Sequence, residues 1–509
     1  MALLTPRKSP AAWPARANVL AQILALLASL WCGVATAAYG PVDVNVPEPP
    51  REFRGAWIAV VHNLDWPSSP GLSVRTQEAE LTAILDKAVS LNLNAVIFQV
   101  RPEGDAVYAS PIEPWSPYLS GSMGVSPGYD PLAFAVQEAH RRGLELHAWF
   151  NPFRALAGSD YRASSTHAAS QHPEYIRPYG SQRWMDPGEP WVRERALAVI
   201  RDVVRRYDID GVHIDDYFYP YPNKDKAGNK IPFDDQASYA RYGGGQKRDD
   251  WRRANVNGFV RSFYSMVKTE KPWVKVGISP FGIWRPGVPS SIEARLDAYQ
   301  DIAADSVSWL RNGWCDYFSP QLYWSIDPRP QSFSTLLHWW HSQNELGRHV
   351  WPGIATERIH SSDDPGRPAT EILRQAELAR SMAREGDGGH IHWSIKALRQ
   401  NRDGVDQLLM RGPYVEKALV PASPWLGRAA PAAPHLKATE AGKGVTLTWN
   451  PDTVSRWWAV QIKNADRWSL WTVQEGTDTR LTLPNTPAAI CVRGLSASGV
   501  LGAPAIVGR

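Results

Sequence analysis

The stretch DIDGVHIDDYFYP, residues 208–220, begins like a buried strand and ends in two adjacent carboxylates and a cluster of tyrosines. Alternate residues of a strand face opposite ways, so Val212 and Ile214 share one face while His213 and Asp215 share the other. The apolar pair suits an outer layer packed on helices. This parity predicts that Asp215 points toward the interior of a closed sheet, above His213.

Seven further runs of this kind occur in the same region of the chain, and longer amphipathic stretches separate them. The eight runs are residues 54–61, 94–102, 144–152, 210–218, 274–282, 316–324, 349–356 and 389–395. Helix signals are clear in residues 76–91 and in residues 130–143, where Asp130 is an N-cap, Pro131 the first helical residue and Gly143 the stop. Eight alternations of strand and helix predict an α/β fold, a closed (β/α)8 TIM barrel.

A doubly wound open sheet is the alternative architecture. Such a sheet would be expected to carry a glycine-rich phosphate loop after its first strand. The segment that follows the first strand, VVHNLDWPSSPG at residues 60–71, is not such a loop. The closed barrel is therefore favoured, over residues 51–412.

The first 38 residues differ in composition from the barrel region. They combine three basic residues, an apolar run and small residues up to Ala38, which predicts a secretory signal peptide and an exported protein of the periplasm or cell envelope. The apolar run is short for a membrane span and no second candidate follows, so we expect no transmembrane span in the mature protein. Cys32 would suit a lipoprotein, but Trp31 stands where a small residue is expected.

The C-terminal part of the chain contains two segments that differ from the barrel region in composition and periodicity. Residues 413–434 are rich in Pro and Ala and indicate a linker or a surface strap. Residues 435–509 alternate with period two and predict a small all-β sandwich. Within it GVTLTWN, residues 444–450, and VRGLSASGVLG, residues 492–502, resemble a fibronectin type III domain.

The amino-acid composition narrows the kinds of molecule that the chain could bind. Removal of the first 38 residues, which hold three basic and no acidic side chains, lowers the formal net charge from +4 to +1. A nearly neutral chain offers no electrostatic case for nucleic acid. The 24 Trp and 18 Tyr are more than packing calls for, and flat rings stack on sugars. Cys315 and Cys491 are expected in separate domains, so no disulfide framework is expected.

The candidate catalytic groups lie where strands end, because barrel enzymes place their reacting groups at the C-terminal ends of the strands. Glycoside cleavage usually needs one ionised and one protonated carboxyl group. Asp215 is the candidate for the ionised one, and Asp216 or Asp105 for the proton donor, since adjacent carboxylates push one pKa upward. The acidic residues ranked below these are Glu357, Glu103 and Asp316.

The inward-facing positions of the other strands suggest how a sugar could be held. Candidates for stacking on or positioning sugars are Trp149, Tyr217, Tyr219 and Tyr323. Candidates for holding hydroxyl or acetamido groups, all polar or charged, are Arg101, His147, Asn151 and Gln321, with Glu357 as a further substrate contact. Gln99 shares the inward face of the second strand with Arg101.

Each candidate also has a structural interpretation. Adjacent aspartates at a strand end can be loop caps or can bind a structural cation, and Arg101 could pair with a carboxylate inside the barrel. A catalytic metal would need a convergent set of histidines. The first strand ends in His62 alone and the only His-x-His pair, His390 and His392, is on the last strand. Neither a metal nor a cofactor is therefore expected.

Six blocks of this sequence, in the same order, carry a family resemblance. They are REFRGAWIAVV, FQVRPEGDAVY, GLELHAWFNPFR, DGVHIDDYFYP, ISPFGIWRP and DYFSPQLYW. Together they resemble the glycosyl hydrolase-like 10 family, related to the divisome-localised glycan hydrolase of enteric bacteria, over residues 51–412. The resemblance implies an envelope enzyme that cleaves peptidoglycan glycan strands, preferably those stripped of peptides, with envelope or cell-division partners. It supports Asp215, Asp216 and Asp105 as functional positions.

A more distant likeness leaves alternatives open. On the fourth strand of chitinases an acidic run ends in a catalytic Glu, and here Tyr217 stands at that place, so the substrate-assisted chitinase reaction is disfavoured. Amylases carry a nucleophilic Asp at the same strand end, in the manner of Asp215. A glycan-binding envelope protein without turnover, or a hydrolase of another polysaccharide, also fits the residues.

Overall fold

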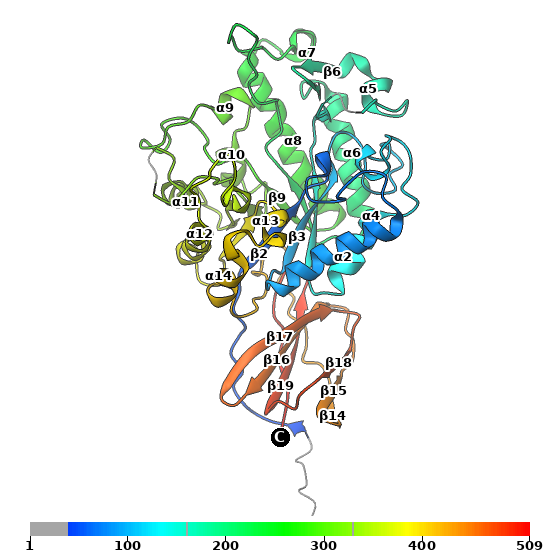
Figure 1. The fold of residues 1–509 in the computed structure, drawn as a ribbon, viewed down its shortest axis with the longest axis vertical. Coiled ribbons are helices and arrows are strands. Elements are labelled where there is room, and N and C mark those ends of the chain that lie inside the picture. Colours follow the sequence, from blue (N-terminus) through cyan, green and yellow to red (C-terminus); the bar gives the residue numbers. More distant parts are fainter. Residues whose placement is uncertain (1–38, 159–160, 328–329) are drawn as a thin grey trace, which may run out of the picture.

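The central sheet is built from parallel strands in the order β11-β10-β9-β8-β4-β3-β2-β13-β12 (Figure 1). The computed structural model describes residues 39–158, 161–327 and 330–509, so the predicted signal peptide lies outside the described residues. The strands are β2 (Phe53–Ile58), β3 (Ala95–Arg101), β4 (Glu145–Phe150), β8 (Gly211–Ile214), β9 (Lys275–Ile278), β10 (Tyr317–Phe318), β11 (His349–Val350), β12 (Gly353–Ile354) and β13 (Gly389–His392).

The sheet closes because its two end strands are halves of one segment. Only Trp351 and Pro352 separate β11 from β12, and β11 pairs with β10 while β12 pairs with β13. Hydrogen bonds continue through the gap: Trp351 N donates to Phe318 O at 2.9 Å, and Ile391 N donates to Pro352 O at 3.0 Å. With this segment counted as one strand, the predicted (β/α)8 barrel is confirmed, and each of the eight predicted runs supplies a strand.

Helices cover the outside of the barrel (Figure 1). The predicted helix of residues 130–143 begins as expected, because Asp130 accepts a hydrogen bond from Ala133 N and Pro131 is its first residue. Val212 and Ile214 belong to the apolar layer between strands and helices, which confirms the parity argument. The main helices are α2 (Val74–Ser90), α4 (Pro131–His140), α6 (Pro190–Arg206), α8 (Arg248–Glu270), α10 (Ser306–Arg311), α11 (Phe333–Ser342), α12 (Ala369–Met382), α13 (Ile395–Arg399) and α14 (Val405–Arg411).

The barrel interior needs glycine at two strand positions. A Cβ on Gly277 of β9 would lie 1.9 Å from the ring of Tyr317, and one on Gly211 of β8 would lie 2.6 Å from the ring of His147. Both distances are far below van der Waals contact. The two glycines therefore make room for large polar rings on the neighbouring strands, which fill the barrel axis.

A long connection follows β4 and forms part of the rim. It contains a three-stranded antiparallel sheet in the order β5-β7-β6. Its strands are β5 (Arg154–Leu156), β6 (Ile176–Tyr179) and β7 (Gln182–Met185), and the short helices of this and other rim connections are α3 (Pro117–Ser120), α5 (Ala168–Gln171), α7 (Gln236–Tyr242) and α9 (Ala298–Asp301). This insertion places Arg154 close to the end of β4.

Two antiparallel sheets follow the barrel, one in the order β14-β15-β18 and the other in the order β1-β20-β19-β16-β17. Their apolar faces share one core, with Val445 and Leu447 from the first sheet and Trp458 and Val492 from the second. The strands are β1 (Gly40–Pro41), β14 (Lys437–Ala441), β15 (Gly444–Thr448), β16 (Ser455–Asn464), β17 (Arg467–Glu475), β18 (Arg480–Leu483), β19 (Ala489–Ser496) and β20 (Ala505–Gly508). The likeness to fibronectin type III stays a prediction.

The sandwich lies at the end of the barrel where the strands begin (Figure 1). The segment of residues 413–434 runs between them and contacts the barrel: Leu419 forms a β-bridge with Arg51, and the buried Tyr414 hydroxyl bonds to the rings of His390 and His392. Cys315 and Cys491 are free and buried, one in each part.

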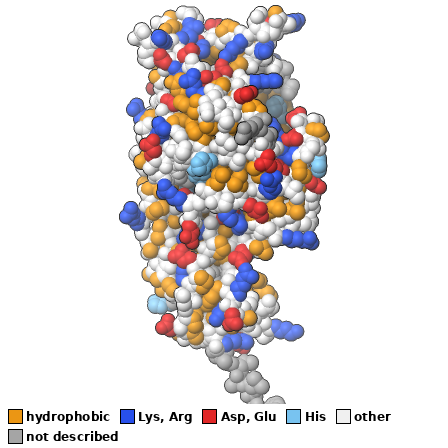
Figure 2. Space-filling model, turned by 90° about the vertical axis from the view of Figure 1, so that its left-hand side faces the viewer, with side chains coloured by type: hydrophobic (Ala, Val, Ile, Leu, Met, Phe, Trp, Pro, Cys, Tyr) orange, Lys and Arg blue, Asp and Glu red, His pale blue; other side chains and the backbone are white. Residues whose placement is uncertain are grey.

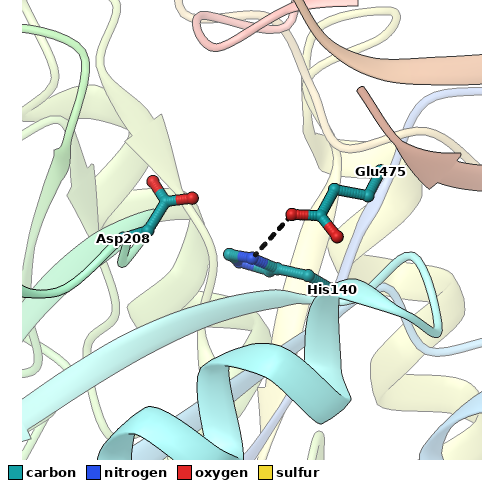
Figure 3. A group of neighbouring side chains, drawn as sticks. All are labelled: His140, Asp208 and Glu475. Atoms are coloured by element: carbon teal, nitrogen blue, oxygen red, sulfur yellow. Dashed lines mark ion pairs between the residues drawn. The ribbon is translucent and has the colours of Figure 1, made fainter. Parts of the chain in front are cut away.

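A charged cluster joins the two parts at this end of the barrel. Figure 3 shows His140 of α4, Asp208 and Glu475 of β17 gathered at the junction. The guanidinium of Arg456, on β16, lies among them: it donates to Asp208 at 2.7 Å and to Asp210 at 3.1 Å, while Nε2 of His140 donates to the other oxygen of Asp210 at 2.9 Å. The carboxylates therefore already surround a cation that the chain itself supplies, and this group carries no case for a metal ion.

We expect Arg456→Met to lower the free energy of unfolding by about 2–3 kcal/mol, because it leaves the buried Asp210 with His140 as its remaining charged partner. The loss is expected to be largest at high pH. The pKa of His140 is raised by Asp210, so the imidazolium is present at low pH and is lost as the pH rises through that pKa. Chemical unfolding at several pH values measures the effect.

Arg311→Met is the matched control, since Arg311 forms an ion pair with Glu345 in which the side chains are 47% and 62% exposed. Such a pair is expected to contribute less than about 1 kcal/mol. Equal losses for the two variants would show that the junction cluster does not stabilise the molecule.

The charged side chains on one face of the molecule are mixed in sign. On the side shown in Figure 2, basic and acidic side chains are interspersed. Over residues 39–158, 161–327 and 330–509, the helices lack the combination of length and apolarity that crossing a membrane requires.

Candidate active site

A cavity of about 260 Å³ opens at the C-terminal ends of the barrel strands. Every strand of the barrel, or the loop after it, contributes to its wall except the seventh. The lining residues are Trp57, Val61, His62, Leu64, Gln99, Trp149, Arg154, Asp215, Asp216, Tyr217, Tyr221, Ser279, Gln321, Tyr323 and Trp393. Asp215 and Asp216 are the only carboxylates among these described lining residues.

Asp215 faces the cavity as the parity of β8 predicted. Its Oδ2 accepts a hydrogen bond from the indole N–H of Trp149 at 3.1 Å, whereas its Oδ1 is buried with no hydrogen-bond partner in the described part of the chain. Burial, and then the charge of Asp216, raise the pKa of Asp215 to about 8, against the effect of the nearby Arg154. Asp215 is therefore able to hold a proton at neutral pH.

Asp216 also lines the cavity, because β8 ends at Ile214 and the strand alternation no longer applies. The Tyr221 hydroxyl donates to Asp216 Oδ2. Burial raises the pKa of Asp216 to about 6, while hydrogen bonds from Tyr221 and Gln321 act to lower it. Near neutral pH the two carboxyl groups are therefore not both fully ionised. The hydrogen bonds from Tyr221 and Gln321 favour the negative charge on Asp216.

A chain of buried hydrogen bonds supports the floor of the cavity. The Trp57 indole N–H donates to His213 Nε2 at 3.2 Å, and this fixes the proton of His213 on Nδ1, which lies 3.0 Å from the Tyr317 hydroxyl. The hydroxyl in turn donates to His147 Nδ1 at 2.8 Å.

The same chain continues to the far end of the barrel axis. His147 Nε2 donates to Glu145 at 3.1 Å, and Lys275 pairs with Glu145 at 2.8 Å. Because Nε2 of His213 accepts from Trp57, this histidine is neutral and has one defined tautomer. Burial lowers the pKa of His213, which agrees with this assignment. The polar interior of the barrel holds the Trp57 ring in place.

Six of the residues predicted from the sequence meet in this cavity. Asp215, Asp216, Trp149, Tyr217, Gln321 and Tyr323 all line it. They come from three strand ends that are far apart in the sequence. Residues from these three strand ends therefore converge on one cavity.

Arg101 does not reach the cavity, and the structural interpretation applies to it. Its guanidinium forms a bidentate pair with Glu113 at 2.6 and 2.7 Å, and both side chains are buried. The register of β3 against β4 shifts between Gln99 and Arg101, and such a bulge re-aims the side chains that follow it. Gln99 therefore lines the cavity while Arg101, two residues later, turns away from it.

Asp105 and Asn151 also lie outside the cavity wall. Asp105 is buried in the loop after β3, where it accepts a hydrogen bond from Glu103 N at 2.7 Å, and burial with the nearby Glu103 raises its pKa to about 7. Asn151 donates to Pro102 O at 3.1 Å. Both side chains therefore hold the loop after β3 in place.

The remaining predicted residues occupy positions behind or beside the wall. His147 lies one layer below the cavity, in the chain of hydrogen bonds, and Tyr219 is buried with its ring against Phe233. Glu357 lines a neighbouring cavity, and a hydrogen bond from Trp393, whose ring belongs to the main cavity, connects the two. Glu357 is near the site but is not one of its lining residues.

Arg154 is the main functional candidate that the sequence did not single out. Its guanidinium lies 4.7 Å from the centre of the Tyr217 ring, and Nε donates to Pro102 O at 3.1 Å. Arg154 is the only Arg or Lys among the described lining residues. Arg154 is the last residue of the block GLELHAWFNPFR, which carries the family resemblance. It lies beyond the predicted strand, so the alternation of strand residues does not predict where its side chain points.

The matching family model and two similar proteins share one description, glycosyl hydrolase. A family model described as Glycosyl hydrolase-like 10 matches residues 52–366. Glycosyl hydrolase YngK of Bacillus subtilis is 43% identical over 410 residues, which covers 78% of this chain and 79% of that protein. Glycosyl hydrolase DigH of Escherichia coli is 36% identical over 311 residues, or 57% of this chain and 70% of that one.

Among solved structures, the PgaB (BpsB) glycoside hydrolase domain from Bordetella bronchiseptica matches with a TM-score of 0.47 and 12% identity. The match covers 71% of this chain and 98% of that domain.

Proposed function

The chain belongs to the glycosyl hydrolase-like 10 family and is a glycoside hydrolase, and from that premise we propose that it cleaves the glycan strands of peptidoglycan. The observation that carries the proposal is the cavity in which two buried carboxyls with raised pKa values lie among aromatic rings and amide groups. Peptidoglycan strands consist of N-acetylated sugars, whose rings and amides suit such a wall.

We assign the catalytic roles to Asp215 and Asp216. Asp215 holds the proton and gives it to the leaving glycosidic oxygen, and its buried, unpartnered Oδ1 is the atom available for that transfer. Asp216, whose charge is favoured by two hydrogen bonds, activates water or attacks the sugar. This division of roles is the reverse of the one favoured by strand parity alone, which took no account of the partners of each carboxyl.

The preferred substrate in this proposal is a strand stripped of its stem peptides. Stripping leaves a free carboxylate on the sugar where a peptide was attached. Arg154 provides a cation in the cavity wall beside the two aspartates, and a guanidinium binds carboxylates well. Two further proposals concern the setting of the protein: export to the periplasm or cell envelope, and envelope or cell-division proteins as partners.

The test uses purified protein, intact sacculi and sacculi stripped of peptides. Mass spectrometry of the soluble fraction is expected to show amino-sugar fragments with new reducing ends, released mainly from the stripped material. Release from neither kind of sacculus, together with hydrolysis of a different polysaccharide, would contradict the proposed substrate. Equal release from both would contradict the preference for stripped strands.

We expect a bell-shaped dependence of kcat on pH. The rate rises as the pH passes about 6, because Asp216 must be ionised, and falls as the pH passes about 8, because Asp215 must keep its proton. Steady-state rates from about pH 4 to about pH 10 measure the profile.

The variant Tyr221→Phe tests whether the acid limb of the pH profile reports the ionisation of Asp216. It removes a hydrogen bond that lowers the pKa of Asp216, so the acid limb is expected at higher pH than in the wild type while the alkaline limb changes less. A maximum near about pH 4, where ordinary carboxyls titrate, would be incompatible with the assigned pair.

A further inference from the structure

Gln99 presents an unsatisfied amide nitrogen at the floor of the catalytic cavity. Its side chain is fully buried and lies on β3, between β2 and β4. Its Oε1 accepts hydrogen bonds from Val60 N and Val61 N, both at 2.9 Å. These bonds fix the amide, because exchanging Oε1 and Nε2 would set donors against donors. Nε2 is left without a hydrogen-bond partner in the described part of the chain.

The chemistry of this nitrogen restricts what it can bind. A buried donor without a partner costs free energy, and most buried polar groups in folded proteins are paired. Nε2 carries hydrogen atoms and has no acceptor capacity, so its partner must be an acceptor. A carbonyl oxygen meets this need without bringing a hydrogen atom of its own, whereas a hydroxyl brings one.

The wall beside Gln99 includes several apolar side chains next to His62. Val61 and Leu64 line the same cavity, and so does Trp57. The indole N–H of Trp57 is occupied by His213, so the ring offers only carbon to the cavity. A group with a carbonyl oxygen on one side and a methyl on the other would meet a fixed donor and an apolar surface together.

We infer that Gln99 selects sugars that carry an acetamido group, with Nε2 donating to the acetamido oxygen and the methyl packing on Val61 and Leu64. This inference rests on the proposed function and adds to it the residue that distinguishes an N-acetylated ring from one with a hydroxyl at the same position. Gln99 is a specificity-determining residue in this account, and Asp215 and Asp216 carry the reaction.

Calorimetric binding of two oligosaccharides tests the inference without relying on turnover. One is an oligomer of N-acetylglucosamine, and the other is the oligomer of glucose with the same linkage and length. The wild-type protein is expected to bind the acetylated oligomer at least about tenfold more tightly. Gln99→Glu keeps an oxygen for Val60 N and Val61 N and replaces only Nε2.

In the Gln99→Glu protein the preference is expected to fall to near parity while the introduced carboxyl is ionised. It is expected to return in part at low pH, where protonation of that carboxyl restores a donor. A loss of folding would not produce this recovery. Ser279→Ala, which removes another unpartnered polar atom of the same wall, is expected to weaken both oligomers alike.

The outcomes separate this inference from the proposed function. A Gln99→Glu protein that keeps the wild-type preference, or a Ser279→Ala protein that loses it as fully, would overturn the inference. Equal binding of both oligomers by the wild type would do the same while leaving glycan cleavage in place. A wild-type protein that binds neither oligomer and releases nothing from sacculi would instead contradict the proposed function.

Discussion

The Asp215→Asn protein is expected to lose at least about a thousandfold in kcat on stripped glycan, with substrate affinity changed by only a few fold. The amide keeps the size of the side chain and still accepts the hydrogen bond from Trp149, but it has no acidic proton for the leaving oxygen. Asp216→Asn is expected to lose a similar factor, because an amide carries no charge. Initial rates and calorimetric binding of the same oligosaccharide measure the two quantities separately.

Asp105→Asn is the matched control for both variants. Asp105 is also a buried aspartate with a raised pKa, yet it lies in the loop after β3 and does not line the cavity. Its replacement is expected to keep kcat within a few fold, apart from any loss of folded protein. A thousandfold loss for Asp105→Asn in a folded protein would return Asp105 to the catalytic pair and remove the assignment to Asp216.

The largest expected effect on stability follows from Arg101→Met, which should lower the free energy of unfolding by about 3–5 kcal/mol. The substitution leaves Glu113 buried with Arg195 as its remaining charged neighbour, at 3.5 Å. It also removes the hydrogen bonds that Arg101 donates to the backbone oxygens of Asn151 and Pro152. Urea unfolding monitored by tryptophan fluorescence measures the loss.

Two further variants show whether the loss of stability comes from the buried ion pair. The double variant Arg101→Met with Glu113→Gln removes both charges and is expected to be more stable than the single variant, since residue 113 then no longer carries a buried charge that has lost its partner. Arg205→Met, which breaks the exposed pair with Glu270, is expected to cost less than about 1 kcal/mol. An Arg101→Met protein with wild-type stability and a raised KM would instead make Arg101 a substrate contact.

The fold was predictable because period and spacing repeat. Eight apolar runs separated by amphipathic stretches are compatible with few architectures. The N-cap of α4 was predicted from the sequence, because Asp130 is followed by Pro131. The apolar runs did not predict the division of the seventh strand. There Trp351 and Pro352 separate β11 from β12. Strand β1 (Gly40–Pro41), which joins the C-terminal sheet, is too short to produce a pattern in the sequence.

The site was predictable only as far as strand parity holds. Trp149 reaches the cavity because β4 alternates regularly, and Asp215 continues the alternation of β8 one residue past its end. Gln321 lies beyond β10, where it forms isolated β-bridges with Phe281 and Gly353. Arg101 lies beyond a bulge, and Arg154 lies in an insertion after β4. A bulge or an insertion reverses or removes the alternation, and neither has a pattern in the sequence that fixes the direction of the next side chain.

The central claim is that Asp215 and Asp216 in this cavity hydrolyse a glycosidic bond, and the most direct test is cleavage of stripped glycan strands in isotopically labelled water. Mass spectrometry of the products is expected to show one labelled oxygen in each new reducing end with the wild-type protein, and no new ends with Asp215→Asn or Asp216→Asn. Products that form without the label, or that form equally with either variant, would contradict the claim.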